Sequence, residues 1–179
     1  MELEDWGELY KELAVKLTDL DGINWLDLWH NQVGFLVEEH PFPTPAAFLS
    51  FRILNPENLG AKTQRVNVQI DIYYFYETFL DTNMGAYNQT DALAYLKTNN
   101  DIHRVLHGSS GENYSEMTRI GFHPVDTGSS GNLYKQSFVC SVIDASASPK
   151  YNEASPGELA FGKGTKPEED NEAPYIIPH

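Results

Sequence analysis

The stretch from Arg65 to Glu77 constrains the fold of this chain more than any other part of the sequence. Apolar side chains occupy every second position: Val66, Val68, Ile70, Ile72 and Tyr74. The positions between them are polar: Arg65, Asn67, Gln69 and Asp71. A period of two is typical of a β-strand that buries one face. Tyr73 and Phe75 then place aromatic rings on the polar side. We therefore expect a sheet whose outer face is covered near these two residues.

Four further segments have the patterns of strands, and two connections between strands are rich in turn residues. The strand segments are Ile23–Gln32, Ala46–Leu54, Met117–Val125 and Leu133–Ala145. His40–Pro45 (HPFPTP) precedes the second of them and can be neither helix nor central strand, because each proline lacks a donor and biases its predecessor toward extended structure. Asn55–Thr63 (NPENLGAKT) and Asp126–Asn132 (DTGSSGN) are predicted to be hairpin connections, the first of them long.

Two segments have helical spacing. In the first 20 residues the apolar side chains form one stripe: Trp6, Leu9, Tyr10, Leu13, Leu17 and Leu20. A second helix is predicted from Asn88 or Thr90, either of which can cap it, to about His107, with Gly108 as its stop. Thr98, Asn99 and Asn100 are weak helix formers, so a break is expected there.

This order of elements predicts an α+β fold, with a mostly antiparallel sheet of four to five strands and two helices packed on one face. The predicted domain covers residues 1–145. Residues 146–179 are acidic and rich in Pro, Gly and Ser, without a period of 2 or 3.6, and are predicted to form a disordered tail. Within that tail, Tyr175–Ile177 is a candidate docking element.

Charge and composition exclude several classes of function. The chain has 179 residues and a net charge of −14, which repels phosphate and disfavours both sequence-specific nucleic-acid binding and docking on anionic membranes. No run approaches the length of a membrane span, and the acidic start MELEDWGELY does not look like a signal peptide. Cys140 is the single cysteine, so no internal disulfide forms, and it is expected to be a small buried hydrophobe.

His103 and His107 are the best candidates for a metal site, because residues four apart share a helical face. The sequence HRVLH lacks the glutamate of HExxH, and a third ligand would have to come from elsewhere, such as Glu112 or His123. The favoured interpretation is histidines at a helix end, stabilised there by the helix dipole. We therefore predict no metal centre.

The remaining catalytic patterns are also unconvincing. Residues 157–163 (GELAFGK) match GxxxxGK, but Gly164 follows where a phosphate-binding loop needs Ser or Thr, and an acidic run comes next. No GxSxG motif is present. Glu38 and Glu39 are adjacent, so a strand or coil aims them apart. The sequence thus predicts a protein that is not an enzyme and has no cofactor.

The chain resembles the tail-terminator, or tail-completion, proteins of long-tailed phages and prophages over residues 1–145. The resemblance rests on the order of elements and on four segments: the proline-flanked HPFPTPAAFLSFRIL, the loop NPENLGAKTQ, the strand VNVQIDIYYFYET and the helix end IHRVLHG. None of these is a catalytic signature. The acidic tail at 146–179 is not part of the family's pattern.

The resemblance implies a ring, expected to be a hexamer, that caps the tail tube and provides the docking surface for head-connector proteins. Its subunits would contact one another through outer-face aromatics and loops, for which the candidates are Tyr73, Phe75, Asn58, Leu59, Lys62 and Asp126. A heterologous contact that closes on itself produces such a ring. The implied location is the virion tail, after assembly in the bacterial cytoplasm.

Three other interpretations remain open from the sequence. The chain can be another head–tail joining, neck or tube protein, which polymerisation into tubes would reveal. It can be an enzyme that uses His103 and His107, which bound metal would reveal. It can also be a small monomeric binding module whose sheet face takes a peptide or a small ligand.

Overall fold

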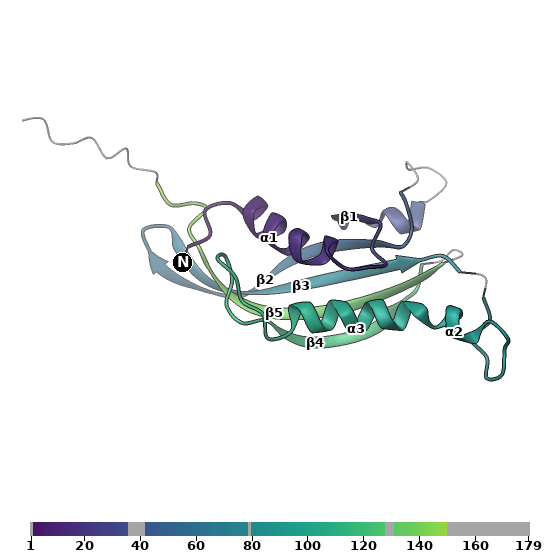
Figure 1. The fold of residues 1–179 in the computed structure, drawn as a ribbon. Coiled ribbons are helices and arrows are strands. Elements are labelled where there is room, and N and C mark those ends of the chain that lie inside the picture. Colours follow the sequence, from purple (N-terminus) through teal and green to yellow (C-terminus); the bar gives the residue numbers. More distant parts are fainter. Residues whose placement is uncertain (1, 36–41, 79, 128–130, 150–179) are drawn as a thin grey trace, which may run out of the picture. The chain divides into compact units, whose positions relative to one another are not determined.

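The strand predicted from residues 65–77 is the middle strand of a five-stranded sheet (Figure 1). The computed structural model describes residues 2–35, 42–78, 80–127 and 131–149. In chain order the elements are α1 (Trp6–Thr18), β1 (Trp25–Leu28), the 3-10 helix η1 (Gln32–Phe35), β2 (Ala46–Gly60), β3 (Thr63–Tyr76), α2 (Gln89–Ala92), α3 (Ala94–Leu106), β4 (Thr118–Val125) and β5 (Asn132–Asp144).

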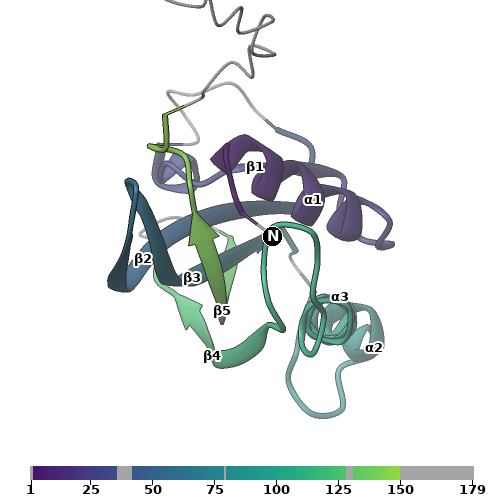
Figure 2. The same cartoon turned by 90° about the vertical axis from the view of Figure 1, so that its left-hand side faces the viewer.

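The strands lie in the order β1-β2-β3-β5-β4. β1 runs parallel to β2, and every other neighbouring pair is antiparallel. Across the middle of the sheet, Val68 of β3 lies between Ile53 of β2 and Cys140 of β5. Helices α1 and α3 lie on one face of this sheet (Figure 2). The predicted α+β class, with a mostly antiparallel sheet and its helices on one face, is confirmed.

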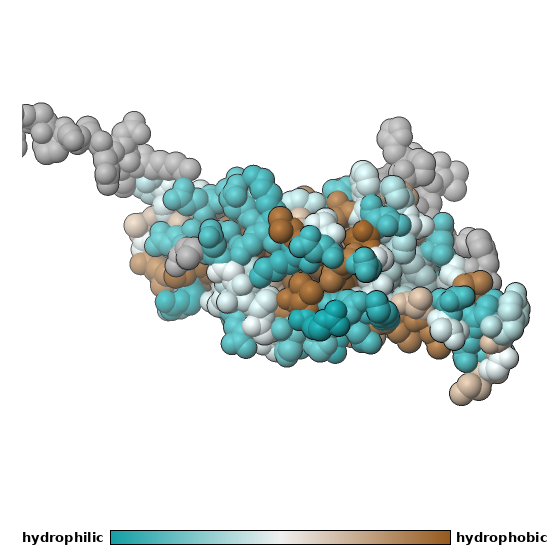
Figure 3. Space-filling view, viewed as in Figure 1, coloured by the Kyte–Doolittle hydropathy of each residue, from teal (hydrophilic) through white to brown (hydrophobic). Residues whose placement is uncertain are grey.

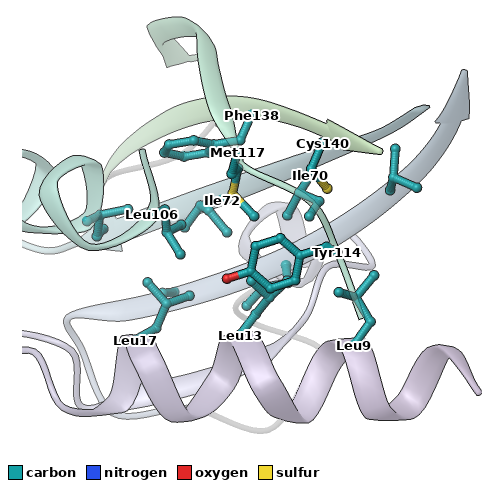
Figure 4. Close-up of a cluster of buried hydrophobic side chains, with 14 of the residues drawn as sticks. Leu9, Leu13, Leu17, Ile70, Ile72, Leu106, Tyr114, Met117, Phe138 and Cys140 are labelled. Carbon is teal, nitrogen blue, oxygen red and sulfur yellow. The ribbon is translucent and has the colours of Figure 1, made fainter. Parts of the chain in front are cut away.

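Helix α1 begins where the side chain of Asp5 accepts a hydrogen bond from the Gly7 amide at 2.8 Å, which satisfies one of the free donors of the first turn. Its predicted stripe faces the sheet, and Leu9, Leu13 and Leu17 are fully buried. Figure 4 shows these leucines pointing at the apolar side chains of β3, β5 and the segment before β4. Burial of such a stripe is the main source of stability for a helix of this length.

The second predicted helix is divided in two. Leu93 separates α2 from α3, and the expected break at residues 98–100 does not occur. Thr98 and Asn99 lie inside α3 and are buried against the sheet, where Asn99 accepts a hydrogen bond from the side chain of Gln136. Tertiary contacts therefore outweigh the weak helix propensity of these residues. Asn88 precedes α2 as predicted, although its side chain makes no capping hydrogen bond.

The first predicted strand, residues 23–32, is longer than the strand observed. Only Trp25–Leu28 pairs with β2. The side chain of Gln32 then closes a turn, accepting from the His30 amide at 2.9 Å and donating to the carbonyl of Leu28 at 2.9 Å. This turn leads the chain into η1 instead of extending the strand.

The prediction of a long loop at residues 55–63 is wrong. β2 and β3 continue to Gly60 and Thr63, so that only Ala61 and Lys62 form the turn. Both turn residues have positive φ, 48° and 62°, as a tight two-residue hairpin turn requires. The register between β2 and β3 shifts between Leu54 and Glu57 and again between Asn58 and Gly60. The residues that were predicted to form a loop are therefore irregularities within a paired strand.

A second, smaller core lies on the face of the sheet opposite α1 and α3. Its buried members are Val33, Ala46, Phe48, Phe75 and Leu133, with Trp29, Phe42, Tyr73 and Val125 packed against them. The aromatic end of β3 is thus covered on its outer face, as the sequence predicted. The cover comes from residues between β1 and β2 of the same chain.

The compact unit that contains these elements runs from Met1 to Pro149. Its last residues return to the hairpin turn, where the Ser148 and Thr63 hydroxyls lie 2.9 Å apart. The remainder of the predicted tail, with Tyr175–Ile177 and the GELAFGK segment, lies outside the described residues.

Candidate assembly surfaces

One edge of the sheet is only partly covered by a neighbouring strand. β1 covers only Ala46–Leu49 of β2, and the Trp29 amide donates to the Leu49 carbonyl at 2.8 Å. From Ser50 onward, β2 has β3 on one side and no strand among the described residues on the other. Because backbone groups alternate in direction along an antiparallel pair, Phe51 and Ile53 direct their N–H and C=O groups outward, as Leu49 does.

The far part of this edge is protected. Asn55 has a φ of 44°, Pro56 lacks a donor, and the register with β3 shifts between Leu54 and Glu57. Bulges and prolines bend an edge strand and hinder pairing with another chain. The part of β2 that is open to another strand is therefore short, about Ser50–Leu54.

Exposed apolar side chains accompany this open backbone. Ile53 of β2 is 45% exposed. On the neighbouring strand β1, Trp25 and Leu28 are each 42% exposed, and Leu59 is also exposed near the hairpin turn. These side chains are spread along the edge and over both faces of the sheet, and an open strand edge with exposed apolar residues is a candidate surface for another protein to cover.

The opposite edge, β4, has its own exposed apolar residues. Ile120 is 58% exposed at a bulge between Arg119 and Gly121, and Phe122 is 41% exposed. The Arg119 guanidinium lies 5.8 Å from the centre of the Phe122 ring, and that ring is 5.4 Å from the ring of Tyr134. This second surface shares no residue with the first.

The helical side of the molecule has a mixed surface. Figure 3 shows apolar and hydrophilic side chains interspersed over the face that carries α1 and α3. Val15 of α1 is exposed, while many charged side chains here have partners: Lys11 pairs with Glu8, and Asp101 with both Lys97 and Arg104. We therefore place the candidate assembly surfaces at the two sheet edges.

The outer-face aromatics predicted to contact a neighbouring subunit are occupied within the chain. Phe75 is fully buried in the second core, so its prediction as an exposed contact residue is corrected. Tyr73 is half-buried and stacks on Trp29, with the ring centres 4.1 Å apart and the planes at 8°. The alternation of apolar and polar residues in β3 could not predict that these two rings are covered, because the residues that cover them lie between β1 and β2.

Beside that stack, the outer face holds a polar network around Asp71. Its carboxylate accepts hydrogen bonds from the Ser137 hydroxyl at 2.5 Å and from the Gln69 amide at 3.0 Å. The Lys135 ammonium lies 3.7 Å away and also 5.7 Å from the centre of the Tyr73 ring. The buried carboxylate is thus satisfied by side chains of β3 itself and of the neighbouring strand β5, and this arrangement has a structural role.

The other predicted contact residues lie at the surface. Asn58, Leu59 and Lys62 are exposed around the hairpin turn, where the Asn58 side chain accepts from the Gly60 amide at 2.9 Å. Asp126 is exposed just after β4 and makes interactions of its own. Their role in subunit contact stays a prediction.

The two candidate metal-binding histidines do lie together at the end of α3, with ring centres 4.9 Å apart. His107 Nδ1 accepts a hydrogen bond from the Arg119 amide at 3.1 Å. Partial burial, and then the nearby positive charge of Arg119 and the His107 ring, lower the pKa of His103. Among the described residues, no group of three or more His, Cys, Asp or Glu side chains is placed to hold a metal ion. Neither Glu112 nor His123 therefore supplies the third ligand.

A row of tyrosines was missed by the sequence analysis. The Tyr76 ring stacks on Tyr95 of α3 with centres 4.3 Å apart, and Tyr74 and Tyr134 continue the row on either side. Burial raises the pKa of Tyr76, and so does the neighbouring Tyr95 hydroxyl. The alternation places Tyr74 and Tyr76 on one face, but no sequence signal connects them with Tyr95.

Comparisons with known proteins add no constraint. No protein-family model matches the chain, and no curated protein matches it. No helix among the described residues is long and apolar enough to cross a membrane. The functional argument consequently depends on the surfaces described above.

Proposed function

We propose that this protein is a structural subunit that assembles head to tail into a closed ring, like the tail-terminator proteins that it resembles. In that role it would cap a phage or prophage tail tube and present a docking surface to head-connector proteins. The observation that carries the proposal is the presence of exposed apolar side chains at both edges of one sheet.

The two edges differ in residues and in geometry. One combines Ile53 with open backbone on β2, whereas the other combines Ile120 and Phe122 with a bulged strand. A symmetric dimer would bring one surface against a copy of itself. Two different surfaces favour a heterologous contact, in which one edge of each subunit meets the other edge of the next, and such contacts form rings when the rotation closes.

Two further features are compatible with such a ring subunit. The order of elements agrees with the order on which the resemblance rests, over the whole range from α1 to β5. The segment NPENLGAKTQ is not the loop that the resemblance includes; it forms the end of a long hairpin whose exposed residues include Leu59 and Lys62. An exposed hairpin of this length would add a third contact surface, for a ring neighbour or for the tail tube.

The first experiment measures the mass of the full chain in solution by light scattering over a concentration series. We expect a closed oligomer, with six subunits as the resemblance implies, and negative-stain images of rings. Long tubes in those images would favour a tube protein instead. A chain that stays monomeric at every concentration would contradict the proposal.

The second experiment tests the head-to-tail contact with one charged substitution at each edge. Ile53→Glu and Ile120→Glu both change exposed side chains, so the fold should persist, and Val15→Glu on α1 is the matched control. Each edge variant alone should be monomeric. Every subunit in the sample then has the same edge disrupted, so the intact edge of one subunit finds no intact opposite edge on another. An equimolar mixture of the two should form dimers and nothing larger.

The mixture distinguishes the proposed contact from a symmetric one. If one edge paired with itself, the variant altered at the other edge would still dimerise alone, and mixing would add nothing. That result, or an assembly that survives both substitutions, would refute the head-to-tail ring. The Val15→Glu control should assemble as the unaltered chain does.

A further inference from the structure

A cavity of about 270 Å³ opens at the end of the sheet where β3 stops. Its walls come from four segments: the end of β3, α2 with the start of α3, the turn after α1 at Gly22, and Pro45 just before β2. Gly22 has a φ of 90°, and a Cβ there would lie 2.7 Å from the Thr98 hydroxyl. Glycine therefore permits the close approach of this turn to α3.

Three tyrosines form the aromatic side of the cavity. Tyr74 and Tyr76 are buried, and their rings lie 6.0 Å apart at 22°; Tyr95 stacks against Tyr76. The Tyr74 hydroxyl donates to the Gly22 carbonyl at 3.1 Å. Stacking and hydrogen bonding hold these rings in place, so the site needs little ordering when a ligand enters.

The charged groups that line the cavity all have one sign. Glu77 and Asp91 line it, and both are exposed. No ion pair or side-chain hydrogen bond of either carboxylate occurs within the described part of the chain. The lining contains no lysine, arginine or histidine.

We propose that this cavity binds an alkylammonium or guanidinium group, as carried by a lysine or arginine side chain of a partner protein. The two carboxylates attract a cation and accept charge-assisted hydrogen bonds from it, and the tyrosine rings, whose faces are occupied by one another, leave their edges to pack against the methylene stem that carries the cation. An anion would be repelled by Glu77 and Asp91, and an apolar ligand would remove water from them without replacing its hydrogen bonds. The site does not rest on the proposed ring, because it uses neither Ile53 nor Ile120.

The partner can be a second copy of this chain or another protein, and the residues that the structure describes include two exposed cations without a carboxylate partner. Arg52 and Lys62 are exposed and form no ion pair within the described ranges, whereas Lys11, Lys97, Arg65, Arg104 and Lys135 each pair with a carboxylate. Lys62 lies in the turn at the start of β3, and the cavity lies at its end. A contact between them would therefore join two subunits.

The probe for the test is N-acetyl-arginine methylamide, with the citrulline analogue as a neutral control of nearly the same shape. Saturation-transfer NMR on the full chain detects weak binding whether or not the protein assembles. We expect millimolar binding of the arginine compound, weakening as salt rises, and no signal from the citrulline compound. Equal signals from the two compounds would overturn the proposal.

Substitutions locate the binding in the cavity. Glu77→Gln with Asp91→Asn should weaken arginine binding about fivefold. Glu2→Gln with Glu116→Gln removes the same charge at exposed positions elsewhere and should change nothing. Ala94→Phe introduces a ring from the lining and should block the site. A loss of affinity in the control pair equal to that in the cavity pair would also overturn the proposal.

Lys62→Gln and Arg52→Gln identify the source of the cation once arginine binding is established. Weaker self-association in either variant assigns the cation to a second copy. Unchanged self-association, with arginine binding intact, assigns it to another protein, and both results agree with a cation site. Failure of the ring proposal would appear in the edge variants, which leave this cavity unaltered.

Discussion

The side-chain amide of Gln136 donates a hydrogen bond to the main-chain carbonyl of Asn99 at 2.8 Å, which ties β5 to α3 within the core. The same amide lies 3.2 Å from the Asn99 side-chain oxygen, and the Gln136 oxygen accepts from Arg119 at 3.3 Å. Gln136 is fully buried on the face of the sheet that α1 and α3 cover. Such a group is costly unless both its donor and its acceptor are satisfied.

Gln136→Leu should lower the free energy of unfolding by about 1–3 kcal/mol, because it leaves the buried side-chain oxygen of Asn99 without this donor. Urea titration followed by circular dichroism measures the change. Asn100→Ala, at an exposed position of the same helix, is the control and should shift stability by less than about 0.5 kcal/mol. Similar values for the two variants would show that the hydrogen bond adds nothing.

The hydrogen bond between Gln136 and Asn99 also explains why the sequence wrongly predicted a break in α3. Thr98 and Asn99 have low helix propensity, and nothing local reveals that Gln136, thirty-seven residues later, satisfies Asn99. Alternation in β3 was a good guide because both faces of that strand are defined by its own residues. The fold class followed from such local patterns.

The sites followed much less well, because they depend on contacts between distant segments. Trp29 covers Tyr73, and Tyr95 meets Tyr76, without any periodicity that connects them. The two-residue turn between β2 and β3 was not predicted for another reason. Ala61 adopts a positive φ there, which in turns is found mainly for Gly, Asn and Asp. An open strand edge such as that of β2 becomes visible only when the partners of each strand are known.

Replacement of the hairpin turn Ala61-Lys62 by Asn-Gly should stabilise the protein by about 1 kcal/mol. Both residues hold a positive φ, which is unfavourable for alanine and lysine and natural for asparagine followed by glycine. Thermal unfolding measures the gain, and the midpoint should rise by a few degrees. A lower midpoint would show that the Lys62 side chain contributes more than the turn conformation.

Trp29→Ala should lower the free energy of unfolding by about 2–4 kcal/mol, because the ring packs on Tyr73 and against Phe48 in the second core. Trp25→Ala is the matched control: this ring is 42% exposed on β1, and its loss should cost clearly less. Near-ultraviolet circular dichroism should change with Trp29→Ala, which removes the stacked pair. Equal destabilisation by the two variants would mean that the second core contributes little.

Cys140 should resist thiol reagents in the folded protein. Burial raises the pKa of its thiol to about 12, and the thiolate is the reacting form. Above the unfolded thiol pKa of about 9, the unfolded chain loses the thiol proton while the folded chain keeps it. The free energy of unfolding therefore declines as pH rises from about 9 toward 12. Cys140→Ala should therefore lose stability less steeply than the unaltered chain between pH 9 and 11, and rapid labelling at neutral pH would contradict the burial.

His103 should give the stability of this protein a mild acid dependence. Its pKa is lowered by burial, and further by the Arg119 guanidinium and by His107, so the folded state favours the neutral ring. Below the unfolded pKa of about 6.5 the unfolded chain binds a proton that the folded chain resists, and stability falls as pH falls through this range. Proton NMR should show His103 titrating below 6.5, and Arg119→Gln should raise its pKa. His103→Gln should flatten the pH dependence of unfolding near pH 6, whereas an unchanged slope would assign that dependence to other groups.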